Sequence, residues 1–325
     1  MQLLTGGLNL EQRKIRKTSH ITGILPPLIT PFRENGDVDY DAFVWNLNRW
    51  NDDPLAGYLV LGSNSETAYL DEGEKLKLIG LTVKTAKKGR LIFAGTGVES
   101  TRETIRLTNK AARLGVQAAL ILTPSFYGGQ MNDEALIKHF TSVADASDIP
   151  ILIYNVPKFT HLNISIEAVR VLSHHPNIIG MKDSLGDVAQ LQAFLRVVHS
   201  DFNLIVGNAS SLYPALSLGI RAGILALANC APKECVEIHR LFERGEHQKA
   251  SELQTRMLAV NRAVTETYGV AGLKYASTLM GYQGGSVRSP LVPLNNEQKA
   301  DLQRILRGGG LLIKSESSRI LSGHG

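Results

Sequence analysis

Lys182 is the residue of this chain whose type and position point most clearly to a chemical reaction. It ends a short apolar run, 177–184, that lies between Pro176 and Gly186 and is typical of a strand buried on both faces. Burial disfavours the charged form of a lysine, and the neutral amine is the nucleophile that forms an imine with a carbonyl group. The alternative is a lysine that extends from a strand end to the surface. The residues near Lys182 therefore decide between the two.

Two other strand ends carry groups that would assist such an amine. Tyr154 ends one strand-like run, and Ser63-Asn64 follows another. A tyrosine can transfer protons to and from a reacting oxygen. A Ser-Asn turn before a helix can present N–H groups and a hydroxyl to a carboxylate. A lysine, a tyrosine and such a turn are the parts of a lysine-dependent aldolase, although Tyr154 could instead pack in a barrel wall and Ser63-Asn64 could be an ordinary turn.

From residue 21 onward, strand-like apolar runs alternate with amphipathic segments that carry helix-start signals. One such signal is the capping box Ser100-Thr101-Arg102-Glu103. Eight strand–helix repeats in about 200–250 residues predict a (β/α)8 barrel, an α/β fold. In this fold the chemistry lies at the carboxyl ends of the strands. The strand-like runs are 22–32, 56–63, 90–97, 117–124, 149–157, 177–184, 202–208 and 222–229.

A doubly wound parallel sheet is the competing fold, but its glycine fingerprint is incomplete. Gly95-Thr96-Gly97 follows a strand-like run, and the third glycine position is Ser100. After residue 230 only helical patterns follow, at 233–266, 271–281 and 295–307. We therefore expect a flexible N-terminal extension at 1–20, the barrel at 21–230, a C-terminal helical subdomain at 231–310 and a flexible tail at 311–325.

Composition excludes several classes of function. The chain has 325 residues and a net charge of +5, and its basic residues are scattered, which argues against nucleic-acid binding. No apolar run is long enough to cross a membrane. Cys230 and Cys235 match no zinc pattern and predict an intracellular location, with the cytoplasm ahead of the mitochondrion. A basic cluster at 13–17 could belong to a targeting peptide, and the histidines show no metal-binding spacing.

Four stretches of the chain make it resemble a known family, the dihydrodipicolinate synthase / N-acetylneuraminate lyase family of pyruvate-dependent class I aldolases. The resemblance runs from Gly23 to about Arg307, and it is nearest to the eukaryotic 4-hydroxy-2-oxoglutarate aldolases. These share the later patterns at 269–274 and 284–290. The four stretches are Gly23-Ile24-Leu25-Pro26-Pro27 through Thr30-Pro31-Phe32, Gly62-Ser63-Asn64-Ser65-Glu66, Tyr154-Asn155-Val156-Pro157 and Gly180-Met181-Lys182-Asp183-Ser184.

The resemblance implies a role for each site residue. Lys182 would form the imine with pyruvate and Tyr154 would be the general acid and base. Ser63 and Asn64 would bind the carboxylate of pyruvate. The pocket would also be lined by the backbones of Gly207 and Leu225. The covalent imine would serve as electron sink, so no cofactor or metal is expected. The resemblance also implies a homo-oligomer, either a tetramer or a dimer, because members of the family usually form one.

Two positions depart from the synthase pattern. Where the synthases have an arginine that binds the second substrate's carboxylate, this chain has Phe159, preceded by Lys158. Losing that bidentate group argues against the synthase substrate. Where family members usually have a relay tyrosine, which in the synthases comes from the neighbouring subunit, this chain has Phe126. The loss of a proton-relay group lowers a rate by about 10²–10⁴, unless Tyr127 or water replaces the hydroxyl.

We therefore predict a Schiff-base lyase that cleaves a 4-hydroxy-2-oxo acid, with 4-hydroxy-2-oxoglutarate, giving pyruvate and glyoxylate, as the first choice. A 2-keto-3-deoxy sugar acid is the second choice, and dihydrodipicolinate synthesis is the third. A different class of function is a catalytically silent barrel that binds an oxo acid as a sensor or scaffold. The missing hydroxyl at Phe126 motivates that alternative, and the presence of both Lys182 and Tyr154 argues against it.

Overall fold

The computed structural model describes residues 20–312 of the chain. The predicted flexible extension, its basic cluster and the predicted flexible tail lie almost wholly outside these residues. The division into a barrel and a helical subdomain at residue 230 stays a prediction. Within the described residues no helix is long and apolar enough to cross a membrane.

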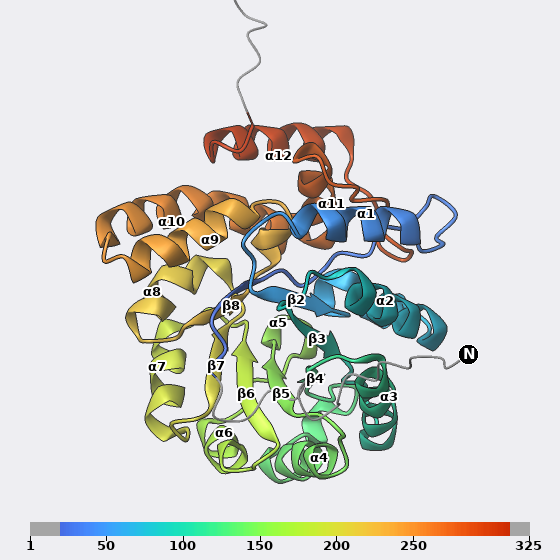
Figure 1. Cartoon of the computed structure of the whole chain (residues 1–325), viewed down its shortest axis with the longest axis vertical. Helices are drawn as coiled ribbons and strands as arrows, with labels where there is room; N and C mark the ends of the chain where they lie inside the picture. Colours follow the sequence, from blue (N-terminus) through green and yellow to red (C-terminus); the bar gives the residue numbers. More distant parts are fainter. Residues whose placement is uncertain (1–19, 313–325) are drawn as a thin grey trace, which may run out of the picture.

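Eight parallel strands form the centre of the molecule (Figure 1), in the order β1-β8-β7-β6-β5-β4-β3-β2. Backbone hydrogen bonds between the two end strands close the barrel: Ala56 N–H donates to Ile24 O at 2.9 Å and Leu28 N–H to Leu59 O at 2.8 Å. The predicted (β/α)8 barrel is confirmed, although each strand is shorter than its apolar run. The strands are β1 Gly23–Leu25, β2 Gly57–Val60, β3 Leu91–Gly95, β4 Ala118–Leu122, β5 Ile151–Asn155, β6 Ile178–Asp183, β7 Asn203–Val206 and β8 Ala222–Ile224.

Helices surround the strands, and their starts follow the capping residues in the sequence. Asp39, Asp71, Ser165 and Asp187 each accept a backbone N–H at a helix N-terminus. Ser100 also accepts the N–H of Glu103, but the returning bond that the predicted capping box requires is absent there. Within residues 20–312 it forms at Asp71 with Glu74 and at Asn295 with Gln298. The helices are α1 Tyr40–Trp50, α2 Glu72–Thr85, α3 Thr101–Leu114, α4 Asp133–Asp145, α5 Pro157–Thr160, α6 Ile166–Ser173, α7 Val188–Val197, α8 Leu212–Ser217, α9 Pro232–Glu243, α10 His247–Arg262, α11 Gly269–Leu279 and α12 Asn296–Gly308.

The C-terminal helices differ from the long helix predicted at 233–266. That segment is two helices, α9 and α10, which lie side by side (Figure 1). The break falls at Gly245, whose φ of 76° is a left-handed conformation that glycine adopts without strain. A short π-helical turn, Ala263–Thr267, follows α10 and leads into α11. The segment is helical as predicted, but the left-handed backbone of Gly245 divides it into two helices.

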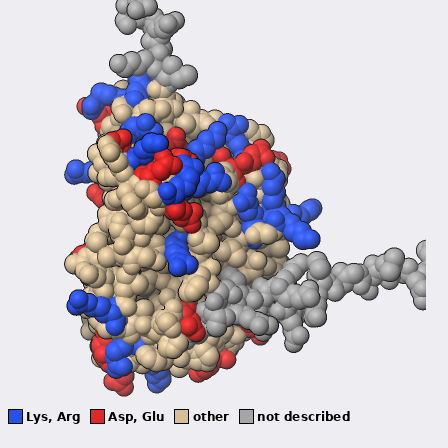
Figure 2. Space-filling model, turned by 60° about the vertical axis from the view of Figure 1, so that its left-hand side comes forward, with Lys and Arg blue, Asp and Glu red and all other residues tan. Residues whose placement is uncertain are grey.

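Charged side chains of both signs are interspersed on the surface. Figure 2 shows lysine and arginine beside aspartate and glutamate over the upper half of the face it presents. Exposed ion pairs of this kind include Lys249 with Glu246 and Arg170 with Glu167. Such mixed charge is typical of a solvated surface rather than of a nucleic-acid interface.

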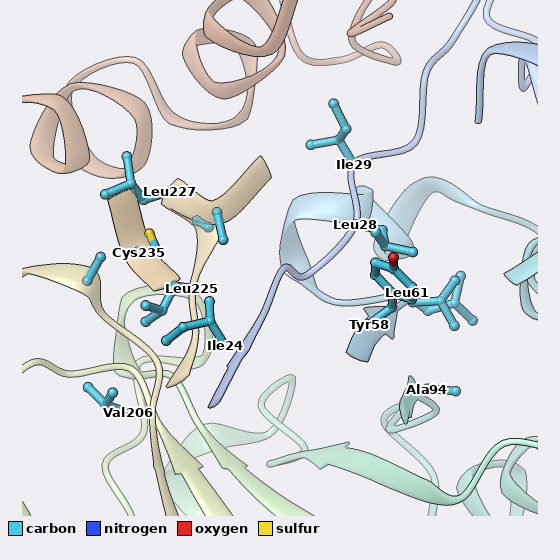
Figure 3. Close-up of a cluster of buried hydrophobic side chains, with 14 of the residues drawn as sticks. Ile24, Leu28, Ile29, Tyr58, Leu61, Ala94, Val206, Leu225, Leu227 and Cys235 are labelled. Carbon is cyan, nitrogen blue, oxygen red and sulfur yellow. The ribbon is translucent and has the colours of Figure 1, made fainter. Parts of the chain in front are cut away.

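Buried side chains form two clusters, one inside the barrel and one between the barrel and its helices. The inner cluster includes Leu25, Leu59, Leu152 and Tyr154. The outer cluster is larger, and Figure 3 shows part of it, with Ile24 of β1 close to Leu225 after β8. Side chains of a strand alternate between these clusters because successive residues point to opposite faces. Tyr154 therefore points into the barrel.

Candidate active site

Lys182 and Tyr154 lie side by side inside the barrel on adjacent strands. They are partners in the β5–β6 register. The Nζ atom of Lys182 lies 4.3 Å from the centre of the Tyr154 ring, and the Tyr154 hydroxyl is hydrogen bonded to the Ser63 hydroxyl at 3.0 Å. Only 3% of Lys182 is exposed. The alternative in which this lysine extends to the surface is wrong. The structure thus brings together three residues singled out from the sequence.

A β-bulge in β6 gives Lys182 its inward direction. Ile151 pairs with Ile178, but Leu152 pairs with Gly180, so β6 contains one extra residue at this point. Ile178 belongs to the outer cluster and Ile179 to the inner one. Simple alternation from Ile178 would place residue 182 on the outer face. Because a bulge shifts the side-chain alternation by one, Lys182 instead faces inward beside Tyr154.

Gly207 lies against the side chain of Lys182. A Cβ atom at this position would come within 2.8 Å of Lys182 Cε and 2.0 Å of the Ser184 hydroxyl oxygen. Only a glycine therefore leaves room for the lysine at this point. The Gly207 N–H donates to Asp183 O at 2.6 Å, which joins the end of β7 to the end of β6.

Ser63 and Asn64 begin a short 3-10 turn, Ser63–Ser65, after β2. The N–H groups of Ser65 and Glu66 close the turn on the carbonyls of Gly62 and Ser63 at 3.0 and 3.1 Å. Among residues 20–312, the N–H groups of Ser63 and Asn64 donate to no backbone carbonyl. Two free N–H groups and a hydroxyl on one turn can bind a carboxylate.

Leu225 follows β8 and is fully buried. Its N–H donates to Leu25 O and its carbonyl accepts from Ala228 N–H, each at 3.0 Å. The N–H is therefore used in joining β8 to β1, and only the carbonyl has a remaining lone pair to offer a ligand. Its side chain belongs to the outer cluster (Figure 3).

A polar network beside Lys182 went unnoticed in the sequence. Asp183 accepts hydrogen bonds from Asn155 Nδ2 at 2.7 Å and from Gln190 Nε2 at 3.0 Å. Burial raises the pKa of the Asp183 carboxyl, and these donors oppose that rise. Asn155 also bonds Asn163 at 2.8 Å. The network fixes the ends of β5 and β6, which carry Tyr154 and Lys182. A signal was present, since Asn155 and Asp183 each directly follow the residue singled out.

Three buried hydroxyls near the strand ends have no hydrogen-bond partner in the described part of the chain. They belong to Ser184, after β6, to Thr30, after β1, and to Thr123, after β4. Buried polar atoms normally have partners, so orphaned ones mark positions for water or a ligand. The Ser184 hydroxyl and the Lys182 side chain both lie against Gly207. The sequence carries a signal for each, because Thr123 and Ser184 directly follow a strand and Thr30 lies near the end of the apolar run 22–32.

Phe126, Tyr127 and Phe159 do not join this group within one chain. Phe126 and Tyr127 lie after β4 with 78% and 68% of their surfaces exposed. Their rings meet edge to face at 5.0 Å. Among the described residues the Tyr127 hydroxyl bonds neither Tyr154 nor Lys182, so it does not complete a relay from its own chain. Phe159 is in α5 and is 55% exposed.

Among the described residues no cluster of three or more histidine, cysteine, aspartate or glutamate side chains could hold a metal ion. Cys230 and Cys235 are both buried and unbridged. Burial raises the pKa of the Cys230 thiol to about 12, so the thiol stays protonated at neutral pH. These cysteines act as small apolar side chains of the outer cluster.

A closed parallel barrel with an inward lysine beside a tyrosine and a turn with two free N–H groups defines a class of barrel enzymes in which an amine can attack a carbonyl group. The chain belongs to the dihydrodipicolinate synthetase family, whose model matches residues 20–308. Enzymes of this family act on pyruvate through a lysine Schiff base without a metal. The chain is thus a pyruvate-dependent carbon–carbon lyase or synthase of class I aldolase type.

Similar proteins cover nearly all of the chain. The 4-hydroxy-tetrahydrodipicolinate synthase of Thermodesulfovibrio yellowstonii is 33% identical over 291 residues, which are 89% of this chain and 99% of that protein. A prophage protein of the dihydrodipicolinic acid synthase family from E. coli K12, solved in complex with pyruvate, has a TM-score of 0.86 at 27% identity and covers 90% of this chain and 100% of its own. A monomeric dihydrodipicolinate synthase variant has a TM-score of 0.85 at 26% identity, with 92% and 100% covered.

Proposed function

We propose that pyruvate forms an imine with Lys182 and that the reaction is the cleavage of a 4-hydroxy-2-oxo acid. The observation that carries the proposal is the buried Lys182 beside Tyr154, whose hydroxyl contacts Ser63. The amine attacks the C2 carbonyl of the substrate and water leaves. The protonated imine then withdraws electrons from the bond between C3 and C4.

Tyr154 moves the proton in this mechanism. It takes the proton of the 4-hydroxyl while the C3–C4 bond breaks, which releases the aldehyde and leaves an enamine on Lys182. Protonation of the enamine at C3 and hydrolysis of the imine then release pyruvate. Ser63 and Asn64 hold the substrate carboxylate, and Gly207 and Leu225 line the pocket. Placing the reacting groups in this way is worth several kcal/mol.

For the aldehyde we propose glyoxylate, so that the substrate is 4-hydroxy-2-oxoglutarate, as in the eukaryotic aldolases that the sequence resembles. That resemblance is the support. Phe159, an apolar, half-exposed side chain, offers no guanidinium to a second carboxylate, so it argues against the arginine-bound substrate of the synthases but does not itself favour glyoxylate, which also carries a carboxylate. The neighbouring Lys158 amine donates to the Thr265 carbonyl. Phe159 favours a 2-keto-3-deoxy sugar acid as the alternative, because that substrate, unlike 4-hydroxy-2-oxoglutarate, has no second carboxylate next to the aldehyde.

A second candidate is 4-hydroxy-tetrahydrodipicolinate synthesis from pyruvate. The names of the similar proteins support it more directly than they support the cleavage reaction. It therefore ranks above the third place that the sequence alone assigned to it. The two reactions share the imine on Lys182 and differ only in the aldehyde that meets the enamine.

Borohydride reduction in the presence of pyruvate, followed by peptide mass mapping, tests the shared step. We expect the reduced adduct on Lys182, and its absence in Lys182→Arg. An adduct on another lysine, or none on folded protein, would contradict the proposal and favour an oxo-acid sensor. Rates with 4-hydroxy-2-oxoglutarate, with 2-keto-3-deoxy sugar acids, and with pyruvate plus aspartate semialdehyde then decide the substrate. Inactivity with all three in protein that forms the adduct would also favour the sensor.

We also propose that the chain forms a homo-oligomer, a tetramer or a dimer, inside the cell. Support comes from the exposed ring pair of Phe126 and Tyr127, since large exposed aromatic groups are typical of protein interfaces. Monomers exist among similar structures, so mass in solution must be measured. A fully active monomer at assay concentration would contradict the proposal. Nothing in the similar proteins supports the mitochondrial alternative.

A further inference from the structure

Glu66 and Lys274 form a buried ion pair next to the Ser63-Asn64 turn. Their carboxylate and ammonium groups lie 2.5 Å apart, and only 1% and 2% of the two side chains are exposed. The pair joins the end of β2 to α11, more than 200 residues later in the chain. Removing one partner of such a pair leaves a buried charge without compensation, which is strongly unfavourable. The pair plays no part in the imine chemistry proposed above.

Glu66 ends the turn that holds Ser63 and Asn64. Its backbone is left-handed, with φ 56° and ψ 38°, a conformation that is strained for a residue with a side chain. Its N–H closes the turn on Ser63 O at 3.1 Å. Its second carboxylate oxygen accepts the N–H of Arg288 at 2.8 Å. Both oxygens of the side chain are therefore held by the C-terminal part of the chain, and they hold the strained residue in place.

Lys274 connects that turn to the end of β1. Its ammonium donates to Ser286 O at 2.6 Å and lies 4.4 Å from the centre of the Phe32 ring. The N–H of Ser286 donates in turn to Phe32 O at 2.8 Å. Gly284 packs so closely on α11 that a Cβ atom there would lie 2.1 Å from Lys274 O. One ammonium thus fixes the segments after β1 and β2 relative to each other.

Two neighbouring charges act on this amine. Burial lowers the pKa of Lys274 to about 8, and the attraction of Glu66 opposes this while Arg288 adds to it. At pH 7 the amine is therefore mainly charged and the pair is intact. A pair of apolar side chains could stabilise the fold equally well, but it would lack the ion pair with Lys274 and the Arg288 N–H bond that hold the Glu66 carboxylate.

We propose that Lys274 is a positioning residue for the Ser63-Asn64 turn. By holding this turn in place, its buried ammonium in α11 sets the affinity of the site for the carboxylate of the oxo-acid substrate. This inference rests on the proposed function, because it assumes that Ser63 and Asn64 bind that carboxylate. It assigns the C-terminal helices a part in substrate binding that goes beyond stabilising the barrel.

The experiment measures, at pH 7, the pyruvate concentration for half-maximal borohydride trapping on Lys182. The variants are Lys274→Met, Glu66→Gln and the double variant, in which no charge is left unpaired. We expect the double variant to melt near the wild-type temperature and to need at least about 10-fold more pyruvate, while reaching full trapping at saturation. Glu66→Gln retains one acceptor oxygen, enough for one of the two contacts that Lys274 and the Arg288 N–H make with separate oxygens of Glu66, and is expected to show a smaller increase. The matched control Tyr268→Phe removes a 2.7 Å bond to Asp301 between the C-terminal helices and should leave the pyruvate dependence unchanged.

A wild-type pyruvate dependence in Glu66→Gln and in the folded double variant would overturn the inference and leave the pair a purely structural one. The same holds if Tyr268→Phe raises the half-maximal concentration as much as the double variant does. Trapping on Lys182 in the wild-type protein remains the separate test of the proposed function. The two failures are therefore distinguishable.

Discussion

At the scale of single residues, the candidate site depends on two side chains that touch. The ring of Tyr154 covers one side of the Lys182 amine, while its hydroxyl reaches Ser63. The same tyrosine therefore contacts both the nucleophile and the turn that is proposed to hold the carboxylate. Replacing its ring would alter the packing of the barrel interior, whereas removing its hydroxyl keeps the ring and takes away the proton-transfer group together with its bond to Ser63.

Tyr154→Phe is expected to lower kcat for the cleavage by about 10²–10⁴, because it removes the proposed general acid and base but keeps the ring. Borohydride trapping of pyruvate on Lys182 should still reach completion when the reaction time is long. Steady-state rates and the trapped fraction measure the two effects. A kcat equal to that of the wild type would show that another group moves the proton.

Tyr58→Phe is the matched control, because Tyr58 is another buried tyrosine with a hydrogen-bonded hydroxyl. Its partner is Asn51 Oδ1 at 2.9 Å, away from the strand ends that carry the site. We expect it to lose about 1 kcal/mol of unfolding free energy and to keep its catalytic rate. Comparing the two variants separates a loss of chemistry from a loss of stability.

At the scale of elements, β6 determines which way Lys182 points. The bulge between its pairings with Ile151 and Leu152 moves the following residues to the opposite face. Gly180 is the first residue after the shift. A Cβ atom there would lie 2.3 Å from Asn203 O in β7 and 2.9 Å from a methyl group of Leu152 in β5. The bulged strand therefore fits between its neighbours only because residue 180 has no side chain.

Gly180→Ala is expected to push β6 away from β7 and to disturb the direction of Lys182. Overpacking of this kind typically costs about 1–3 kcal/mol of unfolding free energy. Denaturant unfolding measures that loss, and the yield of borohydride trapping at saturating pyruvate measures the position of the lysine. Full trapping in a destabilised protein would show that the bulge is not needed to aim Lys182. Gly80→Ala in α2, where an added Cβ meets nothing within 4 Å, is the control and should be neutral or stabilising.

At the scale of the whole molecule, the helices around the barrel carry a buried group whose protonation opposes folding. His139 of α4 is buried against α3, and its Nδ1 is bonded to the Thr101 hydroxyl at 2.9 Å. Burial lowers the pKa of His139 to about 4. The unfolded chain binds a proton at this residue below about pH 6.5, while the folded chain stays neutral down to about pH 4.

The stability of the molecule is therefore expected to fall as the pH decreases from about 6.5 to 4, because the unfolded state binds the additional proton. The contribution of His139 reaches about 3 kcal/mol at the acid end of this range. His139→Gln should make the loss of Tm between pH 7 and 4.5 smaller. His199→Gln changes a histidine whose side chain is 47% exposed, and it should leave the loss unchanged. Equal acid sensitivity in both variants and the wild type would contradict the assignment to His139.

Local sequence patterns are enough to predict the barrel and most of the residues at its carboxyl end. Eight apolar runs separated by capped helices are a local pattern. Such a pattern predicts the elements correctly because each strand and helix buries its own apolar face. Lys182, Tyr154 and Ser63 were found in the same way, as polar residues that end such runs. Gly245 shows the limit of such patterns. The apolar periodicity predicts one helix across this position, but the left-handed backbone of Gly245 divides it into two.

How those residues meet depends on contacts between distant parts of the chain. The inward direction of Lys182 depends on a bulge that is defined by pairing with a neighbouring strand, and no local pattern in β6 shows it. The support of the Ser63-Asn64 turn by Lys274 joins residues more than 200 positions apart. Such contacts arise from the closure of the barrel and the docking of the C-terminal helices. They are long-range packing events, so the spacing of residues along the chain cannot predict them.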